Sequence, residues 1–231
     1  MKTIRETDNL FRLLRIMPVN CYFVREQDGL TLVDANLPGR GAGIVEAARK
    51  LGAPIKRILL THAHQDHVGS LDELAGLLPD AEVLIGTREA RLLAHDLSMD
   101  PGESKKPLKG GFPVIKTRPT RLVSPGDRVG SLEVFASPGH TPGHVAFLDR
   151  RDSTLIAGDT YQTVGGVNVS IMGGIMFPLP AIFTWDRATT LESARALRTL
   201  NPARLAVGHG PVVDSPVGAM DRAIAAAERR P

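Results

Sequence analysis

Cysteine is almost absent from this chain of 231 residues, in which Cys21 is the single cysteine. One cysteine excludes a disulfide framework within the chain, and it also excludes a cysteine-rich zinc site. Any metal bound by this protein must therefore be held by histidine and carboxylate side chains.

Long apolar runs are also missing. No run reaches about 18 residues, the length that a membrane-spanning helix needs. Residues 1–20 lack the continuous apolar stretch of a signal peptide. We therefore expect a protein of the reducing cytoplasm that does not bind a membrane.

The chain has little excess of one charge. It has 28 Lys and Arg and 25 Asp and Glu, which gives a formal net charge of +3. The basic residues are spread along the chain and form no basic stripe, so we expect no nucleic-acid partner. The hydrophobic fraction of 42% is enough for a large core. Without a visible linker or repeat, the sequence predicts one domain over residues 1–231.

Apolar periodicity alternates between the strand and helix types, which predicts an α/β fold. The expected helices are Gly43–Leu51, Gly69–Leu78, Thr87–His95, Asp186–Leu200 and Asp214–Arg230. The expected strands are Cys21–Arg25, Leu30–Asp34, Lys56–Leu60, Glu82–Ile85, Arg121–Val123, Leu132–Ala136, His144–Leu148, Thr154–Ala157 and Arg204–Val207. The Gly- and Pro-rich segment Asp96–Pro113 is expected to form an exposed loop.

Four of the seven residues in the segment Thr61–His67 are histidine or aspartate, which are good metal ligands. Alternate residues of an extended segment point the same way, so His62 and His64 are expected to face one metal. Asp66 continues this spacing, and His67 turns with the start of a helix. The segment lies between the end of a strand and a helix, where ligand sites of α/β folds collect.

Three further candidate ligands, His140, Asp159 and His209, each follow a predicted strand and stand next to glycine. Glycine allows the backbone to approach an ion closely. Taken singly, a histidine at such a place is more often an ordinary core or surface residue, and Asp159 is equally a turn or cap residue. Their shared context with the Thr61–His67 segment favours a metal site.

The chain resembles the metallo-β-lactamase superfamily of hydrolases in one ordered set of residues: His62, His64, Asp66, His67, His140, Asp159 and His209. The resemblance extends from Asp34 to His209, and glyoxalase II and lactonases share this ligand set. It implies an αββα sandwich, in which two mixed β-sheets are flanked by helices and the site lies at one edge.

The resemblance also implies a pair of divalent ions, with Zn²⁺ expected and Mn, Fe, Co or Ni as alternatives. One ion would be held by His62, His64 and His140. The other would be held by Asp66, His67 and His209, with Asp159 bridging the two. Asp34 would support the site from outside the ligand set, whereas His95 and His144 match no ligand position.

The charges of such a site favour hydrolysis. Two divalent ions outweigh two aspartates and a bridging hydroxide by about one positive charge, which stabilises an anionic intermediate. Zinc lowers the pKa of bound water to about 7. Asp66 is the expected proton carrier. The sequence thus predicts a hydrolase that uses a metal-bridging hydroxide on a small ester, lactone, thioester or phosphoester.

The sequence differs from particular subfamilies at single positions, and these differences limit the predicted substrate. The commonest zinc β-lactamases have Cys where this chain has Asp159, which argues against antibiotic hydrolysis. Lactonases place Tyr three residues after the bridging Asp, whereas Tyr161 comes two residues after it. The alternative is a mononuclear-iron redox enzyme of the same fold, similar to persulfide dioxygenases. A metal-stabilised binding module is disfavoured, because structural zinc sites are normally closed by four ligands.

The segment Tyr161–Phe183 is both glycine-rich and strongly apolar. One interpretation is a wall of the pocket for a small-molecule substrate, with Tyr161 as a catalytic polar group near the metals. The other is a buried strand or a homodimer contact through residues 164–183. Met176 and Phe177 are the side chains whose replacement would separate these interpretations.

Overall fold

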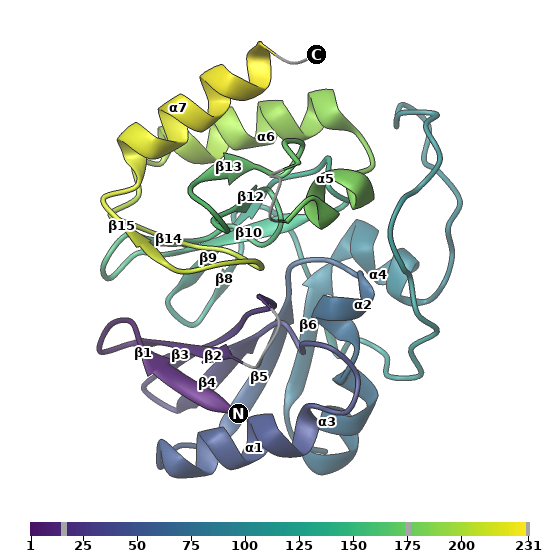
Figure 1. Cartoon of the computed structure of the whole chain (residues 1–231). Helices are drawn as coiled ribbons and strands as arrows, with labels where there is room; N and C mark the ends of the chain where they lie inside the picture. The colour runs from purple at the N-terminus through teal and green to yellow at the C-terminus, as the bar shows by residue number, and fades with distance from the viewer. Residues whose placement is uncertain (15–17, 174–176, 230–231) are drawn as a thin grey trace. The chain divides into compact units, whose positions relative to one another are not determined.

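The computed structural model describes residues 1–14, 18–173 and 177–229. The chain divides into two compact units (Figure 1). Unit 1 comprises residues 1–96 and 111–123, and unit 2 comprises residues 97–110 and 124–231. The expectation of one domain over residues 1–231 stays a prediction.

Unit 1 is built on a mixed sheet of seven strands, counted over its described residues, in the order β1-β2-β3-β4-β5-β6-β7. The strands are β1 (Lys2–Arg5), β2 (Leu10–Leu14), β3 (Cys21–Glu26), β4 (Gly29–Val33), β5 (Ile55–Leu60), β6 (Glu82–Gly86) and β7 (Arg121–Val123). The pairs from β1 to β4 are antiparallel, and those from β4 to β7 are parallel. Strand β4 is buried along its whole length, as expected for a central strand of such a sheet.

The helices of unit 1 are α1 (Gly41–Lys50), α2 (Gln65–Val68), α3 (Leu71–Leu77) and α4 (Thr87–Leu93). Helix α1 forms because Ile44, Ala47 and Ala48 recur on one face, which is buried. It ends at Lys50, Leu51 is its C-cap, and Gly52 follows with a φ of 69°. The predicted helices at these places are confirmed, but the one expected over Gly69–Leu78 is the shorter α3, preceded by α2.

Unit 2 carries a mixed sheet in the order β15-β14-β11-β10-β9-β8 and a separate two-stranded ribbon, β12-β13. Its strands are β8 (Arg128–Val129), β9 (Leu132–Ala136), β10 (Val145–Asp149), β11 (Thr154–Ile156), β12 (Tyr161–Gln162), β13 (Asn168–Val169), β14 (Arg204–Ala206) and β15 (Val213–Asp214). Only the β11–β14 pair of the larger sheet is parallel, among the strands described. The carboxyl ends of β11 and β14 therefore lie at the same edge.

The helices of unit 2 are α5 (Leu179–Phe183), α6 (Arg187–Thr199) and α7 (Val217–Glu228). Helices α6 and α7 lie side by side in Figure 1. Helix α6 begins after Asp186, whose carboxylate accepts a hydrogen bond from the Thr189 N–H at 3.0 Å. A buried apolar cluster joins the sheet, the ribbon and both helices through residues that include Leu148, Val169, Leu197 and Met220.

Most predicted strands are found within a residue or two of their expected ends, and Asp96–Pro113 forms no helix or strand, as predicted. Strands β1 and β2, the first two of the sheet of unit 1, were not predicted. Two mixed sheets flanked by helices agree with the predicted fold class. Within the described ranges no helix is long and apolar enough to cross a membrane.

Candidate metal centre

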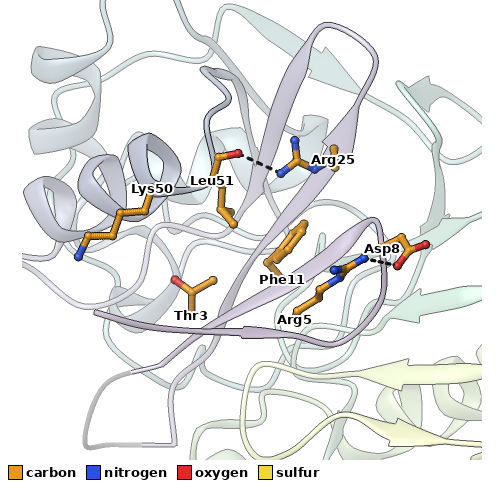
Figure 2. Close-up of a pocket in the computed structure, with 7 residues that line it drawn as sticks. All are labelled: Thr3, Arg5, Asp8, Phe11, Arg25, Lys50 and Leu51. Carbon is orange, nitrogen blue, oxygen red and sulfur yellow. Dashed lines mark hydrogen bonds and ion pairs between the residues drawn. The ribbon is translucent and has the colours of Figure 1, made fainter.

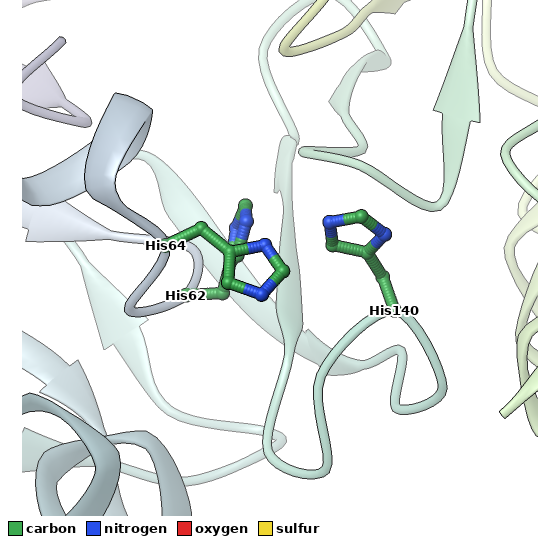
Figure 3. A group of neighbouring side chains, drawn as sticks. All are labelled: His62, His64 and His140. Atoms are coloured by element: carbon green, nitrogen blue, oxygen red, sulfur yellow. The ribbon is translucent and has the colours of Figure 1, made fainter. Parts of the chain in front are cut away.

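The histidine-rich segment of unit 1 directly follows β5. His62, His64 and His67 are all buried. The ring centroid of His62 lies 4.8 Å from that of His64 and 4.0 Å from that of His67. Figure 3 shows His62 and His64 projecting from the same stretch of chain, with His140 drawn in its own loop. The expected pairing of His62 with His64 is therefore present within unit 1.

Asp66 differs from its expected conformation. It does not continue the extended stretch, because α2 already begins at Gln65. Asp66 and His67 thus stand together on the first turn of this helix. A carboxylate oxygen of Asp66 lies 3.8 Å from Nε2 of His67. Four of the predicted ligands are brought together at one end of β5.

Hydrogen bonds on the far side of the rings fix which nitrogen of His67 and His62 carries a proton. Nδ1 of His67 lies 2.8 Å from Oδ2 of Asp34. The Thr61 hydroxyl donates to the same carboxylate at 2.8 Å, so its oxygen accepts from Nδ1 of His62 at 3.0 Å. Both neutral rings therefore carry the proton on Nδ1, and Nε2 retains the lone pair that a metal needs.

A buried glutamate supports the same segment. The Ala63 N–H donates to a carboxylate oxygen of Glu89 at 2.8 Å, and Glu89 is fully buried on α4. This bond holds the backbone between His62 and His64. Sequence reasoning missed this bond, because Glu89 is a lone carboxylate within a helix and its partner lies 26 residues away.

Unit 2 brings together the three remaining predicted ligands. His140 lies in the loop between β9 and β10, Asp159 follows β11, and His209 follows β14. Oδ2 of Asp159 lies 3.0 Å from Nε2 of His209 and 3.4 Å from Nε2 of His140. All three side chains are buried. The Nε2 atoms of two different imidazoles thus lie close to one carboxylate oxygen.

Thr184 fixes the tautomer of His140. The Thr184 hydroxyl donates to the backbone oxygen of Pro180 at 2.7 Å. Its oxygen then accepts from Nδ1 of His140 at 2.9 Å, which leaves the lone pair on Nε2. His62, His67 and His140 therefore share one arrangement, in which an oxygen accepts from Nδ1–H and Nε2 carries the lone pair. Thr184 was missed because it lies 44 residues from its partner.

This donor set fits divalent ions of the zinc type. Neutral imidazole Nε2 atoms and carboxylate oxygens are ligands that such ions accept. Oxygen acceptors behind the imidazoles are the usual support of metal-binding histidines. The residues of both units thus fit metal binding, with neither group relying on cysteine.

Tyr161 corrects one expectation. It is fully buried, and its hydroxyl donates to the backbone oxygen of Ala194 on α6 at 2.6 Å. Burial raises the pKa of this phenol. The side chain packs within the apolar cluster of unit 2, together with Val169 and Leu197. Tyr161 is therefore a core residue and not a polar group that faces a substrate.

Two other features carry no chemistry. Burial raises the pKa of the Cys21 thiol to about 12, so this cysteine is not a nucleophile. A pocket of about 500 Å³ lies in unit 1, and Figure 2 shows seven residues that line it. Its Arg25 stacks over the ring of Phe11 and donates to the backbone oxygen of Leu51, and its Arg5 pairs with Asp8. These cations already have partners within the pocket, and none of its residues is a predicted ligand.

A family model described as the metallo-beta-lactamase superfamily matches residues 14–209. The chain belongs to this superfamily. The chain is 47% identical over 215 residues to the "uncharacterized protein YobT" of Bacillus subtilis (strain 168), across 93% of this chain and 92% of YobT. It is 31% identical over 220 residues to the "probable metallo-hydrolase YflN" of the same organism, across 85% of this chain and 82% of YflN.

Two solved structures agree with this chain in fold. The DIM-1 metallo-beta-lactamase matches with a TM-score of 0.74 at 16% identity, across 100% of this chain and 97% of that one. The protein TTHA1623, solved in a di-iron-bound form, matches with a TM-score of 0.64 at 26% identity, across 89% of this chain and 94% of that one. The predicted superfamily and fold class are confirmed. Membership of this superfamily supports a metal-dependent hydrolase in general terms.

Proposed function

We propose that the ligand groups of the two units form one dinuclear centre that hydrolyses a small substrate. His62, His64 and His140 would hold one divalent ion, and Asp66, His67 and His209 the other. Asp159 would bridge them. The observation that carries this proposal is the position of Asp159 Oδ2, which lies within 3.4 Å of the Nε2 atoms of both His140 and His209. A bridging carboxylate has to meet ligands of both ions in this way.

The course of the chain supports joining the two groups. Within unit 1, the Gln65 N–H donates to the backbone oxygen of Gly111 at 2.9 Å. Within unit 2, the Trp185 indole donates to the backbone oxygen of Lys106 at 2.9 Å, and the Trp185 N–H donates to the backbone oxygen of His140 at 3.1 Å. The stretch from Lys106 to Gly111 spans at most about 18 Å. The two ligand groups are thus tied to opposite ends of a short segment.

The chemistry divides between the ions and the chain. When bound, zinc-type ions would lower the pKa of water to about 7 and polarise a substrate oxygen. Asp66 is the proposed proton carrier, because its carboxylate is 29% exposed while the other six proposed ligands are buried. It can therefore exchange protons with solvent while the remaining ligands stay fixed.

We propose that the substrate is an ester, lactone or thioester with an apolar acyl group, in preference to a phosphoester, because of the segment 177–184. The Phe177 ring lies 5.1 Å from the His209 ring, and Thr184 holds His140. Between them, α5 exposes Leu179, Ile182 and Phe183. The stretch 177–184 carries no charged residue. An apolar wall beside the ligands suits an acyl chain better than a phosphate group.

The earlier part of Tyr161–Phe183 has a different role. Val169 and Ile171 are buried in the apolar cluster of unit 2, and Val167 and Met172 pack against it. This part agrees with the buried-strand interpretation. Residues 174–176 lie outside the described residues, so the expectation for Met176 is not addressed. The proposed wall, or the alternative homodimer contact, is restricted to α5 and Phe177.

Metal content tests the proposed centre. We expect the purified protein to bind two ions per chain and to hydrolyse at least one member of a panel of lactones, thioesters and phosphoesters. Asp159→Ala should lose at least one ion and most of the turnover. Asp152→Ala is the matched control, since Asp152 pairs with Arg204 on the same sheet. An unchanged metal ratio with full turnover in Asp159→Ala would refute the bridge. A single iron per chain would favour the redox alternative.

Acyl-chain preference tests the wall. The double variant Ile182→Ala with Phe183→Ala should lower kcat/KM for long acyl chains more than for short ones, with oligomeric mass measured on the same samples. Leu77→Ala removes an equally exposed apolar side chain from α3 and serves as control. An unchanged chain-length preference together with loss of a dimer would instead assign α5 to an interface.

A further inference from the structure

The loop between β9 and β10 contains a second histidine beside the proposed ligand. His144 closes the stretch Ser137–His144, and it is as buried as His140. Their ring centroids lie 6.2 Å apart. The role of His144 follows from its two ring nitrogens.

Both nitrogens of His144 are occupied by bonds within unit 2. The backbone N–H of Asp159 donates to Nε2 of His144 at 3.0 Å, so this nitrogen supplies its lone pair to the protein. Nδ1 then carries the proton and donates to the Ser137 hydroxyl at 2.7 Å. His144 therefore has no lone pair left for a metal, in contrast to His140.

These bonds join two ligand-bearing loops. Ser137 and His144 form the base of the loop that carries His140, because the Ser137 N–H also donates to the His144 backbone oxygen at 2.9 Å. The Asp159 N–H belongs to the turn that follows β11. A single imidazole thus connects the loop of His140 to the turn of Asp159.

We propose that His144 is a positioning residue, which sets the 3.4 Å separation between Nε2 of His140 and Oδ2 of Asp159. This inference rests on the function proposed above. The bond from His144 holds the backbone of Asp159, so it restricts where the carboxylate of that residue can lie. Losing a support of this kind typically lowers metal affinity about 10- to 100-fold.

Two amide variants separate positioning from simple packing. In His144→Gln, Oε1 occupies nearly the place of Nε2 and can still accept from the Asp159 N–H. In His144→Asn, Oδ1 occupies the place of Nδ1 and reaches only the Ser137 side. We expect Zn²⁺ affinity, measured by competition with a chelator, to fall about tenfold or more in the Asn variant and about threefold or less in the Gln variant.

The melting temperature of the metal-free protein is the second readout. A residue that only fills space would lower it similarly in both variants without separating their Zn²⁺ affinities, and that result would overturn the proposal. His95→Gln changes an exposed histidine and is the control. If the Asn variant does not fold, Ser137→Ala replaces it, since it frees the His144 ring and should weaken Zn²⁺ binding by an intermediate factor; wild-type affinity in Ser137→Ala would overturn the proposal.

The outcome also distinguishes this inference from the proposed function. If the wild-type protein binds neither Zn²⁺ nor any of Mn, Fe, Co and Ni, the dinuclear centre itself is refuted. If the wild type binds Zn²⁺ and His144→Asn binds it equally tightly, the centre stands and the positioning role of His144 is wrong.

Discussion

Oδ2 of Asp34 lies 2.8 Å from Nδ1 of His67, and the same carboxylate accepts from both the backbone N–H and the hydroxyl of Thr61. Asp34 therefore orients His67 directly and His62 through Thr61. It adopts a left-handed backbone conformation with a φ of 64°. For a residue other than glycine this is uncommon, and it directs the carboxylate back toward the segment after β5.

Removal of this carboxylate should weaken metal binding without removing a ligand. We expect Asp34→Ala to lower Zn²⁺ affinity about 10- to 100-fold, because two imidazoles lose their orientation together. Chelator competition measures the change. Asp28→Ala is the control, since Asp28 pairs with Arg57 at the surface of the same sheet. Equal affinities in the two variants would mean that Asp34 is only a turn residue.

The corrected position of Tyr161 gives a prediction of the opposite kind. Tyr161→Phe should leave kcat/KM within about twofold of wild type and lower the free energy of unfolding by about 1 kcal/mol, the typical contribution of one buried hydrogen bond. Denaturant unfolding and steady-state kinetics measure the two effects. A large loss of kcat with unchanged stability would restore a catalytic role to this hydroxyl.

Gly139 should not tolerate a side chain. Its φ is 127°, and a Cβ atom there would lie 2.2 Å from the backbone nitrogen of Thr190 on α6. Gly139→Ala should therefore destabilise unit 2 by about 2 kcal/mol or more and displace His140. Gly126→Ala is the matched control, because Gly126 has a φ of 93° with nothing within 4 Å of the added atom. The difference in melting temperature between the two variants isolates the steric clash, and similar melting temperatures would show that α6 adjusts.

The low pKa of Asp186 implies that the free energy of unfolding decreases in acid. Desolvation alone would raise the pKa of this carboxyl, but the hydrogen bonds from the Thr189 N–H and Lys106 prevail and lower it to about 2. Because the folded pKa lies below the unfolded value of about 3.9, the contribution is present above that pH and is lost as the pH falls toward 2.

We therefore expect Asp186→Ala to cost about 1 kcal/mol of unfolding free energy at pH 6, the usual value of a helix N-cap, and progressively less toward pH 2. Denaturant unfolding across this range measures it. Asp80→Ala changes an exposed aspartate in the turn after α3 and should have little effect at any pH. A cost that stays constant down to pH 2 would contradict the assigned pKa.

The sequence predicted what depends on local pattern. The end of β5, the Gly-flanked ligands and the helix that begins after Asp186 all follow from periodicity and capping residues within a few positions. It failed for Tyr161 because closeness to Asp159 along the chain does not tell which way a side chain points. On β12, that side chain enters the core.

The supporting residues escaped for another reason. Glu89 lies 26 residues from Ala63, and Thr184 lies 44 residues from His140. No spacing rule connects such pairs, because the fold and not the local chain brings them together. The strands β1 and β2 were missed because residues 1–20 mix charged and apolar residues without a clear period of two.

The path of the chain between the units has a consequence for dissecting the protein. The polypeptide passes from unit 1 to unit 2 after Asp96, returns after Gly110 and leaves again after Val123. No single cut can therefore yield both units intact. A fragment ending at Val123 would retain residues 97–110 but lose two partners of Lys106. These are Trp185, which donates a hydrogen bond to its backbone oxygen, and Asp186, which forms an ion pair with its side chain. Fragments must be designed by deleting or replacing residues 97–110. A protease that cuts within residues 97–110 would leave two pieces, each of which holds part of both units.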